Sequence, residues 1–172
     1  MNTTQQHTGE YLQLSAEISE CSTYRYTLTR RWAVSGQRVC FVMLNPSTAD
    51  GLSDDRTIRK CVGFAKRFEG GELTVVNLYA FRSTDPTVMF RAQKGGTDIT
   101  GWKNNMHIHE AINRADLTIV AWGSDARIDR SRVDLVRSFQ TVRRLHCLRL
   151  TQDGSPGHPL YLSGQSPLLV WR

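Results

Sequence analysis

Three polar side chains that could bind or cleave a ligand follow apolar runs of this 172-residue sequence. Asn45 comes directly after the run Val39–Leu44, Asn77 follows Leu73–Val76, and His158 lies in a loop rich in glycine and proline. Amide groups can read the hydrogen-bonding edge of a planar base, and an imidazole can donate a hydrogen bond or transfer a proton. These residue types therefore predict a polar site that recognises a ligand and acts on it.

The apolar runs are the elements that must position these side chains. Each run is short, unbroken and rich in β-preferring residues, which is typical of a strand buried on both faces of a parallel sheet. The expected strands are Val39–Leu44, Leu73–Val76, Leu117–Trp122 and Cys147–Leu150, and the helices between them are Arg56–Phe68, Trp102–Arg114 and Arg130–Leu145. This alternation predicts an α/β fold, a three-layer α/β/α sandwich around a central four-stranded, mostly parallel sheet.

The carboxyl ends of the parallel strands should meet at one edge of that sheet, where ligands bind in open α/β folds. Asn45, Asn77 and the turn after Trp122 would then lie close together, and the loop with His158 would follow the fourth strand. The polar residues after Asn45, including Ser47, also suit an ordinary turn and helix cap.

The remaining segments are predicted with less regular structure. Tyr24–Leu28 and Arg31–Val34 alternate apolar and polar residues around a short basic turn, which predicts an N-terminal β-hairpin. Residues 1–8 are polar and expected to be disordered, within a single domain that spans residues 1–172. Thr84–Gly101 is longer than connections in compact domains usually are, so it is expected to be a functional or partly mobile loop.

Composition limits the classes of function. The four cysteines form no C-x-x-C pair, so no zinc site, iron–sulfur site or other cofactor is expected, and the thiols suit a reducing cytoplasm. The sequence has no secretory signal pattern and no apolar run long enough to span a membrane. It also has no phosphate-binding P-loop motif and no zinc-deaminase motif. The formal net charge of +6 suggests a polyanionic partner without proving one. A soluble cytoplasmic monomer is expected.

Two further groups of side chains could contribute. Tyr79 and Phe81 offer aromatic faces that could stack a base, beside Arg82, whose guanidinium could hold a phosphate. One of the two rings is expected to pack in the core instead. Asp54 and Asp55 precede a helix, where a capping role is the simpler interpretation of both acids.

The chain resembles two families through short motifs. A small bacterial and phage domain family without an assigned function shares the segments Leu44–Asp50, Asp54–Arg59 and His158–Tyr161. The chain also resembles the uracil-DNA glycosylase superfamily, whose strand-end and His-Pro motifs are similar, in the same order, to Met43–Pro46, Val76–Arg82, Ile119–Gly123 and His158–Ser163.

The glycosylase resemblance implies a role for each matching residue. Asn45 would position the water that attacks the sugar, His158 would hydrogen-bond to the departing base, and Asn77 would read the edge of the base. Leu162 would wedge into the gap left by the flipped nucleotide, with Arg82, Tyr161 and Ser163 contacting DNA.

Two departures from the glycosylase pattern affect these expectations. Asn45 stands where many glycosylases have an aspartate, so Asp54 or Asp55 is the candidate substitute for activating water. Ser47 stands where the uracil-specific branch has a tyrosine that excludes bases substituted at the fifth ring carbon, so a larger pyrimidine could enter.

The resemblance thus implies a monofunctional DNA glycosylase that flips out a mispaired or modified pyrimidine and leaves an abasic site, with phage defence as a possible setting. The expected partner is DNA, either double-stranded with a flipped base or single-stranded. No association with a membrane is expected. Two alternatives stay open: a non-catalytic module that binds a modified base or single-stranded nucleic acid, and a hydrolase of free nucleosides or nucleotides.

Overall fold

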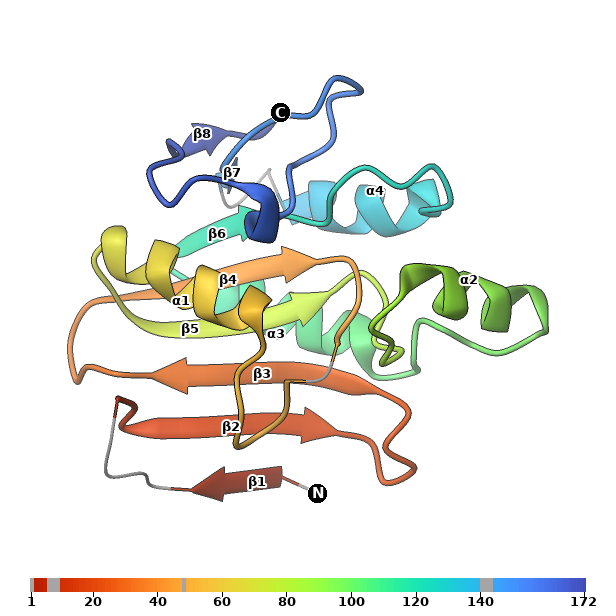
Figure 1. The fold of residues 1–172 in the computed structure, drawn as a ribbon, viewed down its shortest axis with the longest axis horizontal. Coiled ribbons are helices and arrows are strands. Elements are labelled where there is room, and N and C mark those ends of the chain that lie inside the picture. Colours follow the sequence, from red (N-terminus) through yellow and green to blue (C-terminus); the bar gives the residue numbers. More distant parts are fainter. Residues whose placement is uncertain (1, 6–9, 48, 140–143) are drawn as a thin grey trace.

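Four strands come first along the chain, and helices are interspersed with the later strands, in the computed structural model, which describes residues 2–5, 10–47, 49–139 and 144–172 (Figure 1). The strands are β1 Asn2–Gln5, β2 Gln13–Ile18, β3 Arg25–Arg31, β4 Gln37–Met43, β5 Gly70–Asn77, β6 Leu117–Val120, β7 Leu145–Cys147 and β8 Leu169–Val170. The helices are α1 Arg56–Arg67, α2 Pro86–Lys94, α3 Asn104–Arg114 and α4 Arg130–Ser138, and η2 at Pro159–Tyr161 is a short 3₁₀ turn.

All of these strands form one sheet in the order β1-β2-β3-β5-β4-β6-β7-β8. Strands β5, β4, β6 and β7 are parallel to one another and form the centre of the sheet. Strands β3, β2 and β1 extend the sheet beyond β5, and β8 extends it beyond β7, each pairing antiparallel to its neighbour. The α/β class is therefore confirmed, but the predicted four-stranded sheet is too small, because the added strands are shorter or more polar than the central ones.

The central strand β4 is buried on both faces, as its apolar run predicts. Cys40 and Val42 belong to the hydrophobic cluster under α2, α3 and α4, whereas Phe41 and Met43 belong to the cluster under α1. Figure 1 shows α1 in front of the sheet and α3 behind it. Because successive strand side chains point to opposite faces, one strand supports two cores.

Aspartate side chains cap the N-termini of α1, α2 and α4, whereas α3 has no side-chain cap. The Asp55 side chain accepts a hydrogen bond of 2.8 Å from the amide of Ile58, so the expectation that Asp55 caps α1 is confirmed. Asp85 caps α2 in the same way, with Pro86 at the first helical position. Residues 84–101, predicted to be a long loop, therefore contain a helix whose Asp-Pro start signal stands in the sequence.

The N-terminal prediction is wrong in its topology. Most of the first half of the predicted hairpin and Arg31 belong to one continuous strand, β3, which runs through the predicted turn, and residues 32–34 follow its end; the hairpin partner of β3 is β2. Asn2–Gln5, within the stretch expected to be disordered, pairs with β2, while residues 1 and 6–8 lie outside the described residues. The C-terminal elements also differ: α4 ends at Ser138, β7 begins at Leu145, and residues 140–143 are outside the description.

The buried side chain of Arg30 explains why the basic segment continues as strand. Arg30 is 0% exposed, and its Nε lies 2.7 Å from Oδ1 of Asp54. Its Nη2 donates to the carbonyls of Asp50 and Ser53 at 2.6 and 3.1 Å. The guanidinium thereby holds β3 to the segment that leads into α1, and its charge is neutralised inside the protein.

No helix in the described part of the chain has the length and apolar composition that crossing a membrane requires.

We predict that Asp54→Asn lowers the free energy of unfolding by about 3 kcal/mol, because the substitution leaves the Arg30 guanidinium buried without its counter-ion. Urea denaturation followed by circular dichroism measures the change. Glu10→Gln is the matched control, since Glu10 pairs with Lys66 at the surface; there the change should stay within about 0.5 kcal/mol. Equal effects of the two substitutions would contradict the structural role of Arg30.

Candidate functional site

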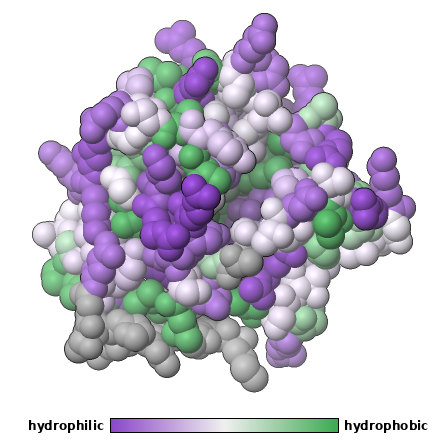
Figure 2. Space-filling model, viewed as in Figure 1, coloured by the Kyte–Doolittle hydropathy of each residue, from purple (hydrophilic) through white to green (hydrophobic). Residues whose placement is uncertain are grey.

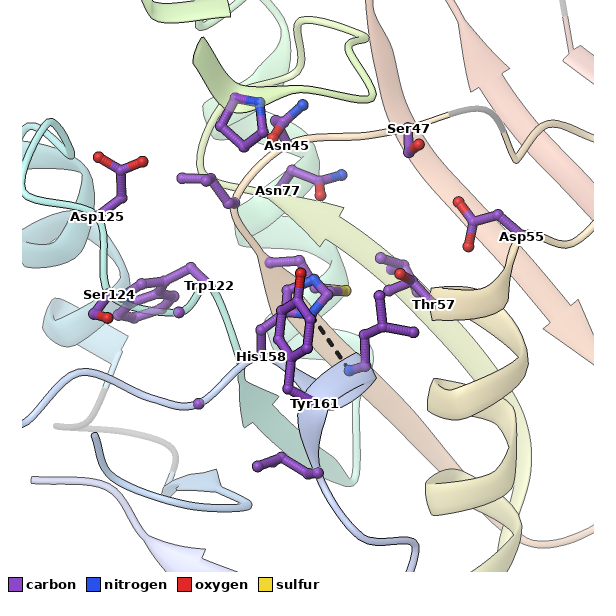
Figure 3. A pocket seen from close by; sticks show the side chains of 18 of the residues that line it. Asn45, Ser47, Asp55, Thr57, Asn77, Trp122, Ser124, Asp125, His158 and Tyr161 are labelled. Carbon is purple, nitrogen blue, oxygen red and sulfur yellow. Dashed lines mark hydrogen bonds between the residues drawn. The ribbon is translucent and has the colours of Figure 1, made fainter. Parts of the chain in front are cut away.

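A cavity of about 680 Å³ opens at the carboxyl ends of β4 and β5 and is closed from the other side by the loop around His158 (Figure 3). Its lining includes most of the candidates expected from the sequence: Asn45, Ser47, Asp55, Asn77, His158, Tyr161 and Leu162. The volume is in the range of small-molecule binding sites, roughly 300–1,000 Å³. The strand-end residues thus meet in one place, as the parallel sheet predicts.

Asn45 is held in one orientation by the segment that follows β5. Its Nδ2 donates to the carbonyl of Ser83 at 2.8 Å and to that of Pro46 at 3.2 Å, and the amide of Ser83 donates back to the Pro46 carbonyl at 2.9 Å. With its NH₂ group engaged, Asn45 has its side-chain oxygen left as the group that can accept a hydrogen bond from a ligand or water.

Asn77 is buried and has a hydrogen-bonding group without a partner. It is 1% exposed, it lines the cavity, and its Nδ2 meets no acceptor among the described residues. The backbone around it is fixed, because Asn104 donates to the carbonyls of Asn77 and Leu78 at 3.0 and 3.1 Å. Since buried polar groups are nearly always paired, this amide is positioned for a ligand.

His158 is held as a neutral hydrogen-bond donor. Its Nδ1 accepts from the backbone amide of Leu160 at 3.3 Å, the dashed line in Figure 3, so the proton of the neutral ring belongs on Nε2. Burial lowers the pKa of His158 below its usual 6.5, and the carboxylate of Asp55 opposes this shift without cancelling it. At neutral pH the cavity therefore contains an uncharged Nε2–H donor.

The wall beside His158 depends on Gly123. This residue has a φ of +80°, which favours glycine, and a β-carbon there would lie 3.7 Å from the β-carbon of His158. Its amide donates to the carbonyl of Pro156 at 2.8 Å, so the turn after β6 supports the His158 loop. On the other side, Lys60 of α1 donates to the Leu162 carbonyl at 2.9 Å.

The two candidate acids are separated by the structure. Asp55 lines the cavity, and only its Oδ1 is used in capping α1. Asp54 is outside the cavity lining, where it pairs with Arg30 and accepts a hydrogen bond of 2.6 Å from the hydroxyl of Tyr11. Asp55 is therefore the carboxylate that can act on a bound ligand.

Several expected contact residues lie elsewhere. Tyr79 is 1% exposed and packs edge-on against Phe90 in the core, so it is not a base-stacking ring. Phe81 packs edge-on against Tyr24, and Arg82 donates to the Ser22 carbonyl at 3.1 Å. Neither these two residues nor Ser163 lines the cavity.

Leu162 and Tyr161, both expected to contact DNA, differ in exposure. Leu162 is 8% exposed and packs in the cluster under α1, so it does not project as a wedge residue must. Tyr161 is 81% exposed at the rim of the cavity, with its ring centroid 5.5 Å from that of His158. The exposed ring is available for stacking.

Sequence reasoning missed several lining residues, among them Arg25, Thr57, Ser124 and Asp125. Arg25 opens a strand and is 2% exposed, yet a charged residue in a polar, alternating segment resembles ordinary surface composition. Ser124 directly follows the Trp122-Gly123 turn, which marks it as another strand-end residue. Asp125 is paired with Arg127 at 2.7 Å, and hydrogen bonding to that guanidinium lowers the pKa of Asp125.

A basic surface flanks the cavity. The outward residues of α1 include Arg56, Arg59 and Lys66, and Figure 2 shows hydrophilic residues gathered over this helix. The N-terminal end of α1 contributes Asp55 and Thr57 to the cavity lining, so the basic face and the cavity adjoin. No group of three or more metal-ligating side chains gathers within the described residues.

Comparison with known proteins gives one match. A family described as "Protein of unknown function (DUF1643)" matches residues 25–160, which include both asparagines, Asp55 and His158. No curated protein and no solved structure matches the chain. The resemblance to the uracil-DNA glycosylases therefore stays a prediction.

We predict that His158 is an Nε2–H tautomer at pH 7 and that its ring titrates below pH 6.5. Burial disfavours the charged ring, so protonation of the folded protein requires a lower pH than that of the unfolded chain, and stability declines as the pH falls below 6.5. Long-range ¹H–¹⁵N NMR measures tautomer and midpoint, with His158→Gln assigning the signal. An Nδ1–H tautomer, or a midpoint above 6.5, would contradict this geometry.

Proposed function

The chain belongs to the DUF1643 family, and from that premise we propose that it is a DNA glycosylase-like hydrolase that removes a mispaired or modified pyrimidine. One observation carries the proposal: a neutral imidazole donor, a buried amide with an unused NH₂ group and a carboxylate line the same cavity. This set matches the needs of N-glycosidic cleavage, and the fold would be a glycosylase-like variant with extra antiparallel strands.

The departing base requires stabilisation of negative charge. As the bond between the sugar carbon and the base nitrogen breaks, its electron pair moves into the base, and negative charge builds on a carbonyl oxygen of the base. The Nε2–H of His158 would donate to that oxygen, and burial makes a donor of this kind more effective than it is in water. Asn77 would bind the polar edge of the same base through its amide.

The attacking water would lie between Asn45 and Asp55. The side-chain oxygen of Asn45 can accept one hydrogen bond from this water, and the Asp55 oxygen not engaged by the helix cap can take up its proton. The water oxygen then bonds to the sugar carbon, which leaves an abasic site and the free base. Asp55 would thus supply the carboxylate that is missing at position 45, where many glycosylases have an aspartate.

The substrate class follows from the space near Ser47. This small residue lines the cavity in place of a ring that would exclude substituents on the fifth ring carbon. A methylated, hydroxymethylated or larger pyrimidine, such as those of hypermodified phage DNA, is therefore the proposed substrate. Defence of the bacterial cytoplasm against phages would be a fitting role.

The surroundings of the cavity fit a DNA strand. Tyr161 is exposed at the rim and would stack on the base next to the flipped nucleotide, and the basic face of α1 would contact phosphates.

One observation favours a non-catalytic reader of modified bases instead. At the position that commonly activates water, Asn45 has no carboxylate, and its amide is engaged with the Ser83 carbonyl. Under this second proposal Asp55 serves only as a helix cap, and binding occurs without base release.

We predict that His158→Ala and Asp55→Asn each lower the rate of base release by about 100-fold. The first substitution removes the hydrogen-bond donor to the departing base, and the second removes the carboxylate that takes the proton from water. Asparagine caps helices about as well as aspartate, so Asp55→Asn should retain its stability. The assay measures abasic sites by alkaline cleavage of oligonucleotides that contain uracil, thymine opposite guanine, or modified cytosines.

His109→Ala is the matched control, because His109 lies on the exposed side of α3, against Phe139 and outside the cavity lining. Its rate should stay unchanged. Absence of base release from the whole panel, including phage genomic DNA, would remove the catalytic proposal, and retained binding would then support the reader.

We predict that Tyr161→Ala weakens binding of DNA with a flipped base by about 10-fold, because stacking on an aromatic ring stabilises an exposed base by roughly 1–3 kcal/mol. Tyr161→Phe keeps the ring and should bind normally. Fluorescence anisotropy measures both. A free nucleoside should bind equally to the wild type and to both variants. If the nucleoside binds and DNA does not, the enzyme acts on nucleosides and not on DNA.

A further inference from the structure

Arg25 is a buried cation in the wall of the cavity. It is 2% exposed, and one of its guanidinium nitrogens, Nη1, donates to the carbonyl of Ala49 at 2.6 Å. Its Nε is buried and has no acceptor among the described residues. The side chain therefore has hydrogen-bonding capacity that the protein does not use.

The second buried arginine of the same strand shows how the protein treats a cation that serves only the fold. Arg30 forms an ion pair of 2.7 Å with Asp54 and also donates to backbone carbonyls. Arg25 forms no ion pair with any described residue. Arg132 is also buried without an ion pair, but its three nitrogens donate to the carbonyl of Leu78 and to Asn105. Arg25 lacks both an ion pair and an acceptor for its Nε, so a counter-ion is expected from outside the chain.

The guanidinium remains charged despite its burial. Desolvation lowers the pKa of Arg25 to about 10, and Asp55 and Asp50 partly oppose this shift. A pKa near 10 leaves the group protonated at neutral pH. The nearby acids have other hydrogen bonds: one oxygen of Asp55 caps α1, and Oδ1 of Asp50 accepts from the amides of Leu52 and Ser53.

The position of Arg25 relates it to the substituent of a bound base. Ala49, which holds the guanidinium, lies two residues after Ser47, the small residue proposed to leave room beside the fifth ring carbon. A cavity of about 680 Å³ is also larger than one pyrimidine ring requires. The unused capacity of Arg25 and the unused space thus belong to the same cavity.

We propose that Arg25 binds an anionic oxygen group of the ligand, so that the substrate is distinguished by a negative charge. This inference rests on the proposed function for its pyrimidine. The oxyanion is either an acidic substituent on the base or a phosphate of the nucleotide, since both accept paired hydrogen bonds from a guanidinium.

Binding to matched ligands tests the proposal without any chemistry. NMR titration compares 5-carboxyuracil with 5-carbamoyluracil, which has a similar shape and no charge, and uridine 5′-monophosphate with uridine. We expect the anionic member of one pair to bind the wild-type protein about 10-fold more tightly. Preference for the charged member of the first pair means that Arg25 binds an acidic substituent of the nucleobase. Preference for the charged member of the second pair means that it binds the phosphate of the nucleotide.

Variants then assign the preference to Arg25. Arg25→Gln should reduce the ratio within the preferred pair to about one, and Arg25→Lys, which keeps the charge and loses the planar fork, should give an intermediate ratio. Arg31→Gln is the matched control, because Arg31 belongs to the same strand, lies outside the cavity lining and donates to the carbonyls of Ala33 and Val34. It should retain the full ratio.

The wild-type comparison decides the matter even where Arg25→Gln does not fold. Equal binding of charged and neutral members in both pairs would overturn the proposal, as would a preference that survives in folded Arg25→Gln. Base release is measured separately. A glycosylase without anion preference refutes only the role of Arg25, and anion preference without base release refutes only the catalytic function.

Discussion

The segment between β4 and α1 is held in place by two buried arginines of β3, and the cavity depends on this attachment. Arg30 binds Asp54 together with the carbonyls of Asp50 and Ser53, and Arg25 binds the carbonyl of Ala49. The described residues of this segment form no helix or strand, so no regular backbone hydrogen bonding fixes it. These charge-assisted hydrogen bonds determine where α1 begins and hence where Asp55 enters the cavity.

The opposite wall is fixed by hydrogen bonds between loops. The Asn45 side chain donates to the Ser83 carbonyl, and the Ser83 amide donates to the Pro46 carbonyl. Asn104 donates to the carbonyls of Asn77 and Leu78, and the amide of Gly123 donates to the carbonyl of Pro156 in the loop of His158. The backbone or side chain of Asn45, Asn77 and the His158 loop is thus held by groups of neighbouring segments. Such preorganisation favours recognition of a defined ligand, because little side-chain entropy is lost on binding.

Two polar groups of the cavity lining are fully buried and have no hydrogen-bond partner among the described residues, the NH₂ of Asn77 and the Nε of Arg25. Both belong to buried side chains, where an unmet hydrogen bond reduces stability. Their retention is understandable if a ligand completes them. Asn77 supports recognition of a base, and Arg25 adds charge selectivity, so one cavity would combine the proposed reaction with a choice among modified substrates.

The sequence alone determined the central strands, the helix cap at Asp55 and the polar residues at the strand ends. These features are local, because each depends on a few neighbouring residues: an apolar run forms a strand, an aspartate caps the helix that follows it, and Pro46 ends a strand. From the alternation of strands and helices it followed that Asn45, Asn77 and His158 would meet, and they do. The size of the sheet did not follow, because polar edge strands leave a weak signal.

Only the tertiary structure decided among chemically equivalent neighbours. Asp54 and Asp55 are adjacent acids, yet one pairs with Arg30 and the other lines the cavity. Tyr79 is in the core while Tyr161 is exposed, and Leu162 is buried beside it. Such choices depend on which distant side chain covers each residue and which charge is left unpaired, and these contacts between segments far apart in the chain are set only when the whole sheet has formed.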